Sequence, residues 1–411
     1  MINYLKSLKK NELFKGSLTL LILLNIGNFL NYLYQFSMAR ILGPIGYGVL
    51  AVLVNIIYIF QVPTLSIQTI VSKHTTKFFV KKEFGKIKGV FDYLIKKTLL
   101  SALILFVIFS ILSIFLSKSL NIPIWLLILT GTFLFGALIY PIGTGILQGM
   151  KKFKVWGWNF IGGNIVKLII AIVLVFLGFE IYGAIIGFVL GTLFSFIFII
   201  PFIKEIIYAK EIKQKINLFS KNSLSTFFAM LLIVFMYSVD VILVRVFFAE
   251  DIVGKYAVIS LIGKIILFGS MTIGYAMFPI TSEKFATGNK TRGVIKKTSI
   301  AIFLLCFLAV ILFAFFPELI IKILFGNQYL SFAKILIYIG IAFSFISFLN
   351  IFVLYKISID KFKLEHILFL LIFFITQVII LFLIHSTIQE FSIAFMFSTI
   401  ISFIGSLILI K

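Results

Sequence analysis

Charged side chains inside long apolar segments are the residues of this sequence that could do chemistry. Lys167 and Lys264 each lie about 12 residues into an apolar segment, or roughly 18 Å at 1.5 Å per residue. That depth is near the middle of a hydrocarbon core about 30 Å thick, beyond the reach of a lysine stem to the interface. Because charge is costly there, we expect both lysines to face a hydrated cavity between the two halves of the chain. The alternative is a structural ion pair, or a lysine anchored at the end of a misplaced span.

Asp240 is the acidic residue that lies well inside a predicted helix. It precedes Arg245 by five residues, which places it about 7–8 Å inside the outer end of that helix. A carboxylate at this depth needs a partner or water. Three roles stay open for Asp240: pairing with a cation, binding a coupling ion, or joining a local hydrogen-bond network.

The remaining polar candidates lie in the first apolar helix and near helix ends. Asn25, Asn28, Tyr32 and Gln35 fall within an arc of about 80° at 100° per residue, so one face of this helix is polar. In lipid such a face must turn inward, either to bond to another helix or to line a polar pathway. Asn28 and Gln35 are the candidates for the pathway. For Arg40 and Arg245, interfacial anchoring and substrate contact are both open.

The elements that position these residues must be membrane helices. The 411 residues are 62% apolar and 12% charged, with a mean hydropathy of +1.19, so they lack the polar surface of a soluble protein. The net charge of +23 would suggest a nucleic-acid partner in a soluble protein. Here the charges lie between apolar segments, which indicates contact with membrane lipids and no nucleic acid.

We predict twelve spans, all α-helical, the first of them a spanning helix and not a cleaved signal. Their expected limits are 17–39, 46–71, 94–117, 122–148, 155–178, 181–203, 222–247, 252–280, 296–316, 331–355, 364–384 and 389–410. The termini and the loops after even-numbered spans, with adjoining span ends, hold 29 of the 37 lysines and arginines. By the positive-inside rule, both termini are cytoplasmic and the chain lies in the cell membrane.

The stretch from Gln35 to Val49 indicates a break between two helices and occurs in two loose copies. Arg40 is followed by a predicted tight turn of Gly43, Pro44, Gly46 and Gly48. About 205 residues later Arg245 precedes Gly254 and Tyr256, as Arg40 precedes Gly46 and Tyr47. The basic segment Lys204–Lys221 divides the chain after six spans. We therefore predict two six-helix lobes of equal orientation, residues 1–208 and 209–411.

Several kinds of chemistry are not expected. His74, His366 and His385 are scattered and predict no metal site, and Cys306 is the single cysteine. No phosphate-binding glycine loop with its lysine is present, so ATP hydrolysis is not expected. The longest outward connection, about residues 317–330, leaves little room for a catalytic domain. The sequence therefore predicts no enzyme and no bound cofactor.

Four segments of the sequence resemble a known family. They are ARILGPIGYGVLAV at Ala39, ILQGMKKFKVWGW at Ile146, SVDVILVRVFFAEDIVGKYAVIS at Ser238 and FPELIIKILFGNQYLSFAKIL at Phe316. Together they resemble the polysaccharide-repeat flippases, the O-antigen and capsule exporter type of the multidrug/oligosaccharidyl-lipid/polysaccharide exporter superfamily. The resemblance extends over essentially the whole chain, but the segments identify a family better than a cargo.

This resemblance implies two six-helix lobes around a central cavity that opens alternately to either side. It implies a lipid-linked glycan substrate with a pyrophosphate on a polyprenol, for which Lys167, Lys264, Arg40 and Arg245 are the cationic candidates. Relatives that work against gradients use protons or sodium, and Asp240 is the candidate for that coupling ion. A polysaccharide polymerase or glycosyltransferases are candidate protein partners.

Two alternatives remain. A multidrug or cation exporter of the same superfamily would prefer an acidic cavity, whereas this chain offers basic candidates and few acids. A non-transporting membrane component of glycan assembly is the other. Neighbouring genes for glycosyltransferases would support glycan export without excluding a scaffold.

The charge bias gives a topological prediction. Single cysteines placed in Thr75–Lys88 should react with an impermeant thiol reagent only from the cytoplasmic side, and those in Ser386–Glu390 only from outside. Labelling of intact cells and of inverted vesicles measures the difference. Reaction of both segments from the same side would contradict the twelve-span topology.

Overall fold

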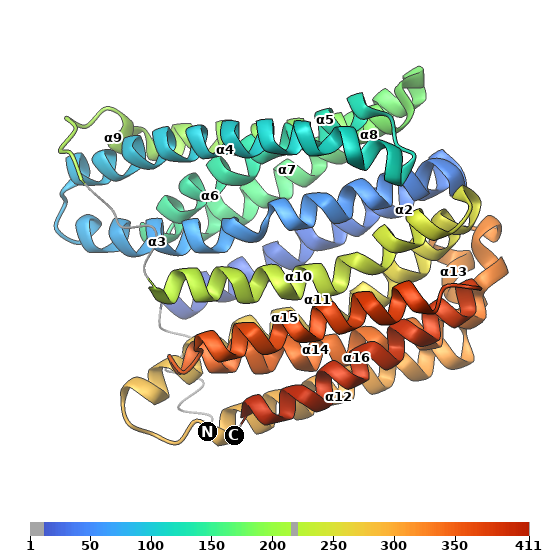
Figure 1. Cartoon of the computed structure of the whole chain (residues 1–411). Helices are drawn as coiled ribbons and strands as arrows, with labels where there is room; N and C mark the ends of the chain where they lie inside the picture. Colours follow the sequence, from blue (N-terminus) through green and yellow to red (C-terminus); the bar gives the residue numbers. More distant parts are fainter. Residues whose placement is uncertain (1–11, 215–220, 411) are drawn as a thin grey trace. The chain divides into compact units, whose positions relative to one another are not determined.

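The computed structural model describes residues 12–214 and 221–410, and within these ranges the chain is helical and contains no strand (Figure 1). The predicted all-α class is therefore confirmed. The chain separates into two compact units, each of which packs its helices around its own buried residues.

The first unit takes in residues 12–42 and 60–214 of the described chain. Its helices pack mainly as the pairs α7 with α8, α3 with α6, and α4 with α6. Its elements are the first part of α2 (Glu12–Phe60), α3 (Val62–Phe79), α4 (Phe84–Leu120), α5 (Ile124–Gly131), α6 (Phe133–Gly149), α7 (Phe153–Leu174), the π-helical turn Val175–Phe179, α8 (Glu180–Ile199), the 3-10 turn Ile200–Ile203 and α9 (Lys204–Ile207).

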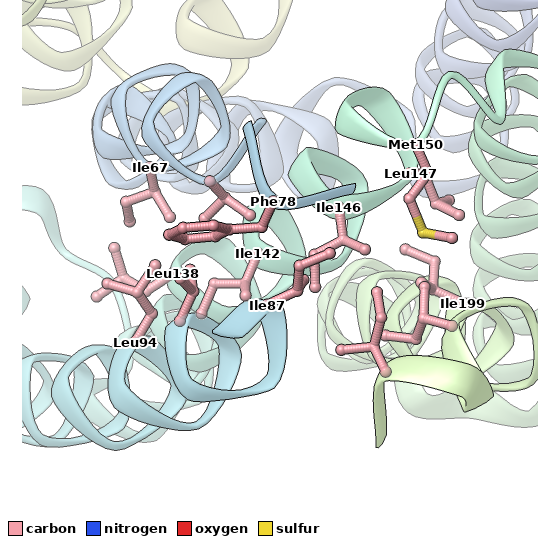
Figure 2. Packing of buried hydrophobic residues seen from close by; sticks show 14 of the residues in the cluster. Ile67, Phe78, Ile87, Leu94, Leu138, Ile142, Ile146, Leu147, Met150 and Ile199 are labelled. Atoms are coloured by element: carbon pink, nitrogen blue, oxygen red, sulfur yellow. The ribbon is translucent and has the colours of Figure 1, made fainter. Parts of the chain in front are cut away.

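Apolar side chains, most of them branched aliphatic, form a buried core between the helices of this unit (Figure 2). Ile67 and Phe78 come from α3, Leu94 from α4, Ile142 from α6 and Ile199 from α8. These side chains repeat at helical spacing on faces that meet, so they fill the space between helices and leave the other faces to lipid.

The second unit contains residues 43–59 and, of the later chain, residues 221–410. Helix α14 packs against α11, α12 and α16, while α15 packs against α10 and α16. Its elements are the second part of α2, α10 (Lys221–Phe247), α11 (Glu250–Ala286), α12 (Arg292–Phe315), α13 (Pro317–Leu324), the 3-10 segment Asn327–Ile335, α14 (Leu336–Ser358), α15 (Leu364–Leu383) and α16 (Ile388–Ile410).

Helix α2 is broken at Gly43, where φ is 68° and ψ is 179°. Glycine adopts this backbone conformation without the steric cost that a side chain would add. Pro44 then begins the next helical stretch, a position that suits its fixed φ and its missing N–H. The predicted turn of Gly43, Pro44, Gly46 and Gly48 is wrong in extent, because Gly46 and Gly48 are already helical.

A close crossing holds the second part of α2 in the second unit. A Cβ on Gly48 would lie 2.9 Å from the backbone nitrogen of Gly254, and a Cβ on Gly254 would overlap the carbonyl oxygen of Pro44. The two backbones can approach this closely because neither glycine carries a side chain. The units thus differ from the predicted lobes 1–208 and 209–411, because residues 43–59 belong to the second unit and residues 209–214 belong to the first.

Ten helical stretches in the described residues are long and apolar enough to cross a membrane. Two of them, Ile22–Phe79 and Phe153–Ile207, contain 58 and 55 residues. At 1.5 Å per residue each would extend over more than about 80 Å, against a core of about 30 Å. Each contains a break, at Gly43 and at Gly178 with a φ of 90°. The count of twelve spans stays a prediction.

The glycine crossing gives a stability prediction. Gly254→Ala should lower the free energy of unfolding by about 1–3 kcal/mol, because the new methyl group meets backbone that cannot rotate away. Thermal unfolding in detergent measures the loss. The matched control is Gly293→Ala in α12, where an added Cβ meets nothing within 4 Å. Equal melting temperatures for the two variants would contradict the close crossing.

Candidate functional site

Asp240 belongs to the second unit and is fully buried on α10. Its Oδ2 accepts hydrogen bonds from the Ser260 hydroxyl at 2.5 Å and the Tyr256 hydroxyl at 3.3 Å. Residues 256, 260 and 264 are spaced by four along α11, so their side chains share one face of that helix. The carboxylate is therefore held by one stripe of α11.

Lys264 completes this stripe. Its ammonium nitrogen lies 3.6 Å from Asp240 Oδ1 and donates to Asn55 Oδ1 at 2.8 Å. The Asn55 amide in turn donates to the carbonyl oxygen of Ala51 at 2.8 Å. The Phe343 ring centroid lies 5.7 Å from the ammonium. We refer to Asn55, Asp240, Tyr256, Ser260 and Lys264 as the Asp240 cluster.

The Asp240 cluster contains one negative and one positive charge, and each of its side chains is no more than 3% exposed. Oδ1 of Asp240 has no hydrogen-bond partner among the described residues. It forms an ion pair with the ammonium of Lys264. Removing either member of such a pair leaves an uncompensated buried charge.

Lys167 is buried in a different way, on α7 of the first unit. Its ammonium donates to Asn31 Oδ1 and lies 4.9 Å and 4.5 Å from the ring centroids of Tyr34 and Phe188. The Tyr34 hydroxyl donates to the Ala184 carbonyl at 3.0 Å, which fixes its ring. In the part of the chain that the structure describes, no carboxylate lies within 4.0 Å of Lys167. The charge is held by aromatic faces and one amide.

The sequence predicts that Lys167 and Lys264 face a hydrated cavity, but in the structure both side chains are buried. Lys167 is 5% exposed and Lys264 is 2% exposed, so each ammonium is enclosed by side chains of its own unit. The reason is that buried acceptors satisfy both groups locally. Sequence reasoning missed Asn31, Tyr256 and Ser260 as partners. The four-residue spacing of Tyr256, Ser260 and Lys264 was the available signal for α11.

The other candidate residues are not gathered into one cluster. Arg245 is buried and its guanidinium donates to Glu250 Oε1 at 2.9 Å, across the turn between α10 and α11. In the first unit, Arg40 and Asn28 are exposed, whereas Gln35 is buried. The polar face of α2 therefore runs from an exposed to a buried environment.

Among the described residues, no three His, Cys, Asp or Glu side chains are grouped to hold a metal ion. Cys306 is a buried free thiol on α12. His366 accepts a hydrogen bond from the Lys363 backbone, and His385 stacks on Phe247 with ring centroids 4.1 Å apart. Both rings thus have structural contacts of their own.

Solved structures of similar fold are multidrug resistance MATE family transporters of the MOP superfamily. An inward-facing one has a TM-score of 0.71 at 14% identity, over 92% of this chain and 94% of that chain. An outward-facing one has a TM-score of 0.70 at 14% identity, over 98% and 96%. A MOP superfamily transporter from Pyrococcus furiosus has a TM-score of 0.68 at 13% identity, over 97% and 96%.

No curated protein sequence matches this chain. A family model does, and its description is "Polysaccharide biosynthesis protein". The model matches residues 37–334, which is more than two thirds of the chain and includes all five residues of the Asp240 cluster and Lys167. The family match shows that the chain belongs to the polysaccharide biosynthesis protein family, and its fold is that of the multi-pass MOP superfamily transporters.

Proposed function

We propose that this transporter flips a polyprenyl-pyrophosphate-linked oligosaccharide across the cytoplasmic membrane for polysaccharide export, by alternating access. The observation that carries the proposal is the family match over residues 37–334, because that family is described by polysaccharide biosynthesis and not by drug resistance. The fold supplies a transporter framework for such a cargo.

The charge of the buried side chains favours an anionic cargo. Lys264 is already neutralised by Asp240, whereas Lys167 is buried in the first unit with aromatic rings and an amide as its partners. An ammonium with no carboxylate in contact attracts an anion strongly in a low dielectric. A pyrophosphate offers several charged oxygens to it. Lys167 is thus our preferred cargo-binding residue, ahead of Lys264.

A multidrug or cation exporter is the second candidate, and the MATE transporters of similar fold favour it. In the Pyrococcus furiosus transporter, a reversed polarity of the binding pocket suggests a different function. That statement concerns that protein, but it supports the view that this fold accepts cargoes of either charge. A cationic drug would be repelled by Lys167, which argues against this candidate.

We place both termini on the cytoplasmic side. Basic residues of two predicted inner loops contact the end of the first unit, where Lys88 donates to the Ile207 carbonyl and Lys152 donates to the Phe202 carbonyl at 2.8 Å. These contacts join the start of α4 to α9, and the α6–α7 turn to the 3-10 turn Ile200–Ile203. Anionic lipid headgroups fit such an end. Glycosyltransferases or a polymerase as partners remain part of the proposal.

The test is flipping of a fluorescent lipid-linked oligosaccharide in proteoliposomes. Lys167→Met should lower the flipping rate about tenfold or more, since a charge-assisted hydrogen bond contributes about 1.5–3 kcal/mol. Melting should stay at or above that of the wild type, because methionine removes a buried charge without leaving a void. Lys167→Arg should retain more activity than Lys167→Met.

The matched control is Lys118→Met, which removes an exposed lysine at the end of α4 and should leave the rate unchanged. A wild-type rate for Lys167→Met would reduce Lys167 to a packing role. Transport of cationic drugs by protein that moves no lipid-linked glycan would favour the second candidate instead.

A further inference from the structure

We propose that Lys264 is a tethered counter-ion that fills the place of a free monovalent cation beside Asp240, so that the native protein binds no sodium there. Asp240 is the acid for which the sequence leaves a coupling-ion role open. The geometry of the Asp240 cluster assigns the position of that ion to a side chain of the protein itself.

The atoms around the ammonium of Lys264 are oxygens of the kind that bind hard cations. Asp240 Oδ1 and Asn55 Oδ1 lie 3.6 Å and 2.8 Å from its nitrogen. The hydroxyls of Ser260 and Tyr256 approach the other carboxylate oxygen. A carboxylate, an amide and hydroxyls are typical ligands of hard metal cations. The ammonium therefore contacts two of the oxygens of a cluster whose side chains are all buried.

A second cation is unfavourable while Lys264 is present. The cluster has one carboxylate, which one ammonium already neutralises at 3.6 Å. Each of its residues is no more than 3% exposed, so repulsion between two cations would be weakly screened. A sodium ion entering the cluster would lose its hydration shell, and no unpaired negative charge there would offset that free-energy cost.

The ammonium of Lys264 also connects two helices of the second unit. Lys264 belongs to α11 and donates to Asn55 on the second part of α2, so the ammonium joins a helix to a segment distant in sequence. A free ion could leave this position, whereas the covalently attached ammonium cannot diffuse away. The cluster therefore contributes constant cohesion to the second unit, independent of the ions on either side of the membrane.

Removing the ammonium should convert the cluster into a sodium site. Lys264→Met keeps an apolar stem of similar length and leaves the oxygens of Asp240, Asn55, Ser260 and Tyr256 in place. The melting temperature of purified Lys264→Met should rise with sodium chloride relative to choline chloride at equal ionic strength. The double variant Lys264→Met with Asp240→Asn should lose this response. The wild-type protein should melt at the same temperature in both salts.

Lys167→Met is the matched control, since it removes a buried lysine that has no carboxylate within ion-pairing distance among the described residues. It should show no sodium response. A sodium response in the wild type that Asp240→Asn abolishes would overturn the proposal, because the ion would then bind with Lys264 present. A folded Lys264→Met that ignores sodium would overturn it as well. If Lys264→Met does not fold, Lys264→Gln replaces it. The comparison of wild-type melting temperatures in sodium chloride and choline chloride still shows whether the native protein binds sodium.

The transport readout rests on the proposed function. Flipping by the wild type in proteoliposomes should be the same with and without a sodium gradient, whereas Lys264→Met should flip faster when sodium is supplied. Absence of flipping by every form would contradict the proposed cargo. The melting measurements would still decide the role of Lys264, so the two failures are distinguishable.

Discussion

Hydrocarbon forms no hydrogen bonds, and this constraint governs where each polar atom of the protein goes. Many serines and threonines donate to the carbonyl one turn back in their own helix. Ser113 donates to Phe109 at 2.8 Å, and Ser347 donates to Phe343 at 2.8 Å. Longer amide side chains join separate helices instead, as where Gln377 on α15 donates to the Met236 carbonyl on α10 at 2.9 Å. Polar residues are therefore either satisfied locally or used to connect helices.

The same constraint gives the two buried lysines different characters. Lys264 is paired with a full opposite charge, so its cluster is electrically neutral and acts within the second unit. The ammonium of Lys167 lies beside two aromatic rings, Tyr34 and Phe188, which supply attraction but no net negative charge. Lys264 thus joins helices of the second unit through an ion pair and an amide, whereas Lys167 contacts an amide and two aromatic rings of the first unit. Depth in the membrane alone does not distinguish these roles.

Sequence reasoning reached the helical membrane class because long apolar segments permit few other structures in lipid. For the same reason it singled out Asp240, Lys167 and Lys264 as charged residues inside membrane helices, but it expected both lysines to face water, whereas they are buried. It did not find Asn31 as a partner, because helical periodicity defines a face of a helix and not the helix that packs against it. Asn31 also lies outside the arc shared by Asn28 and Gln35. Pairing across helices depends on three-dimensional packing, which one sequence does not record.

The placement of the second part of α2 also escaped prediction. Hydropathy divides the chain at its basic centre, whereas the backbone approach between Gly48 and Gly254 assigns residues 43–59 to the later helices. A glycine pair about 200 residues apart carries no signal in either local segment. The physical cause is steric fit, which depends on both backbones at once.

This arrangement has a consequence for biosynthesis. Residues 43–59 leave the ribosome about 200 residues before α11, a delay of about 10–40 s at 5–20 residues per second. Throughout that interval the segment lacks the helix against which it will pack. Asn55 can satisfy its amide on the Ala51 carbonyl, but its oxygen must wait for Lys264. The second unit can therefore be completed only late in translation, and nascent chains that stop before α11 retain an orphaned helix for quality-control proteases to recognise.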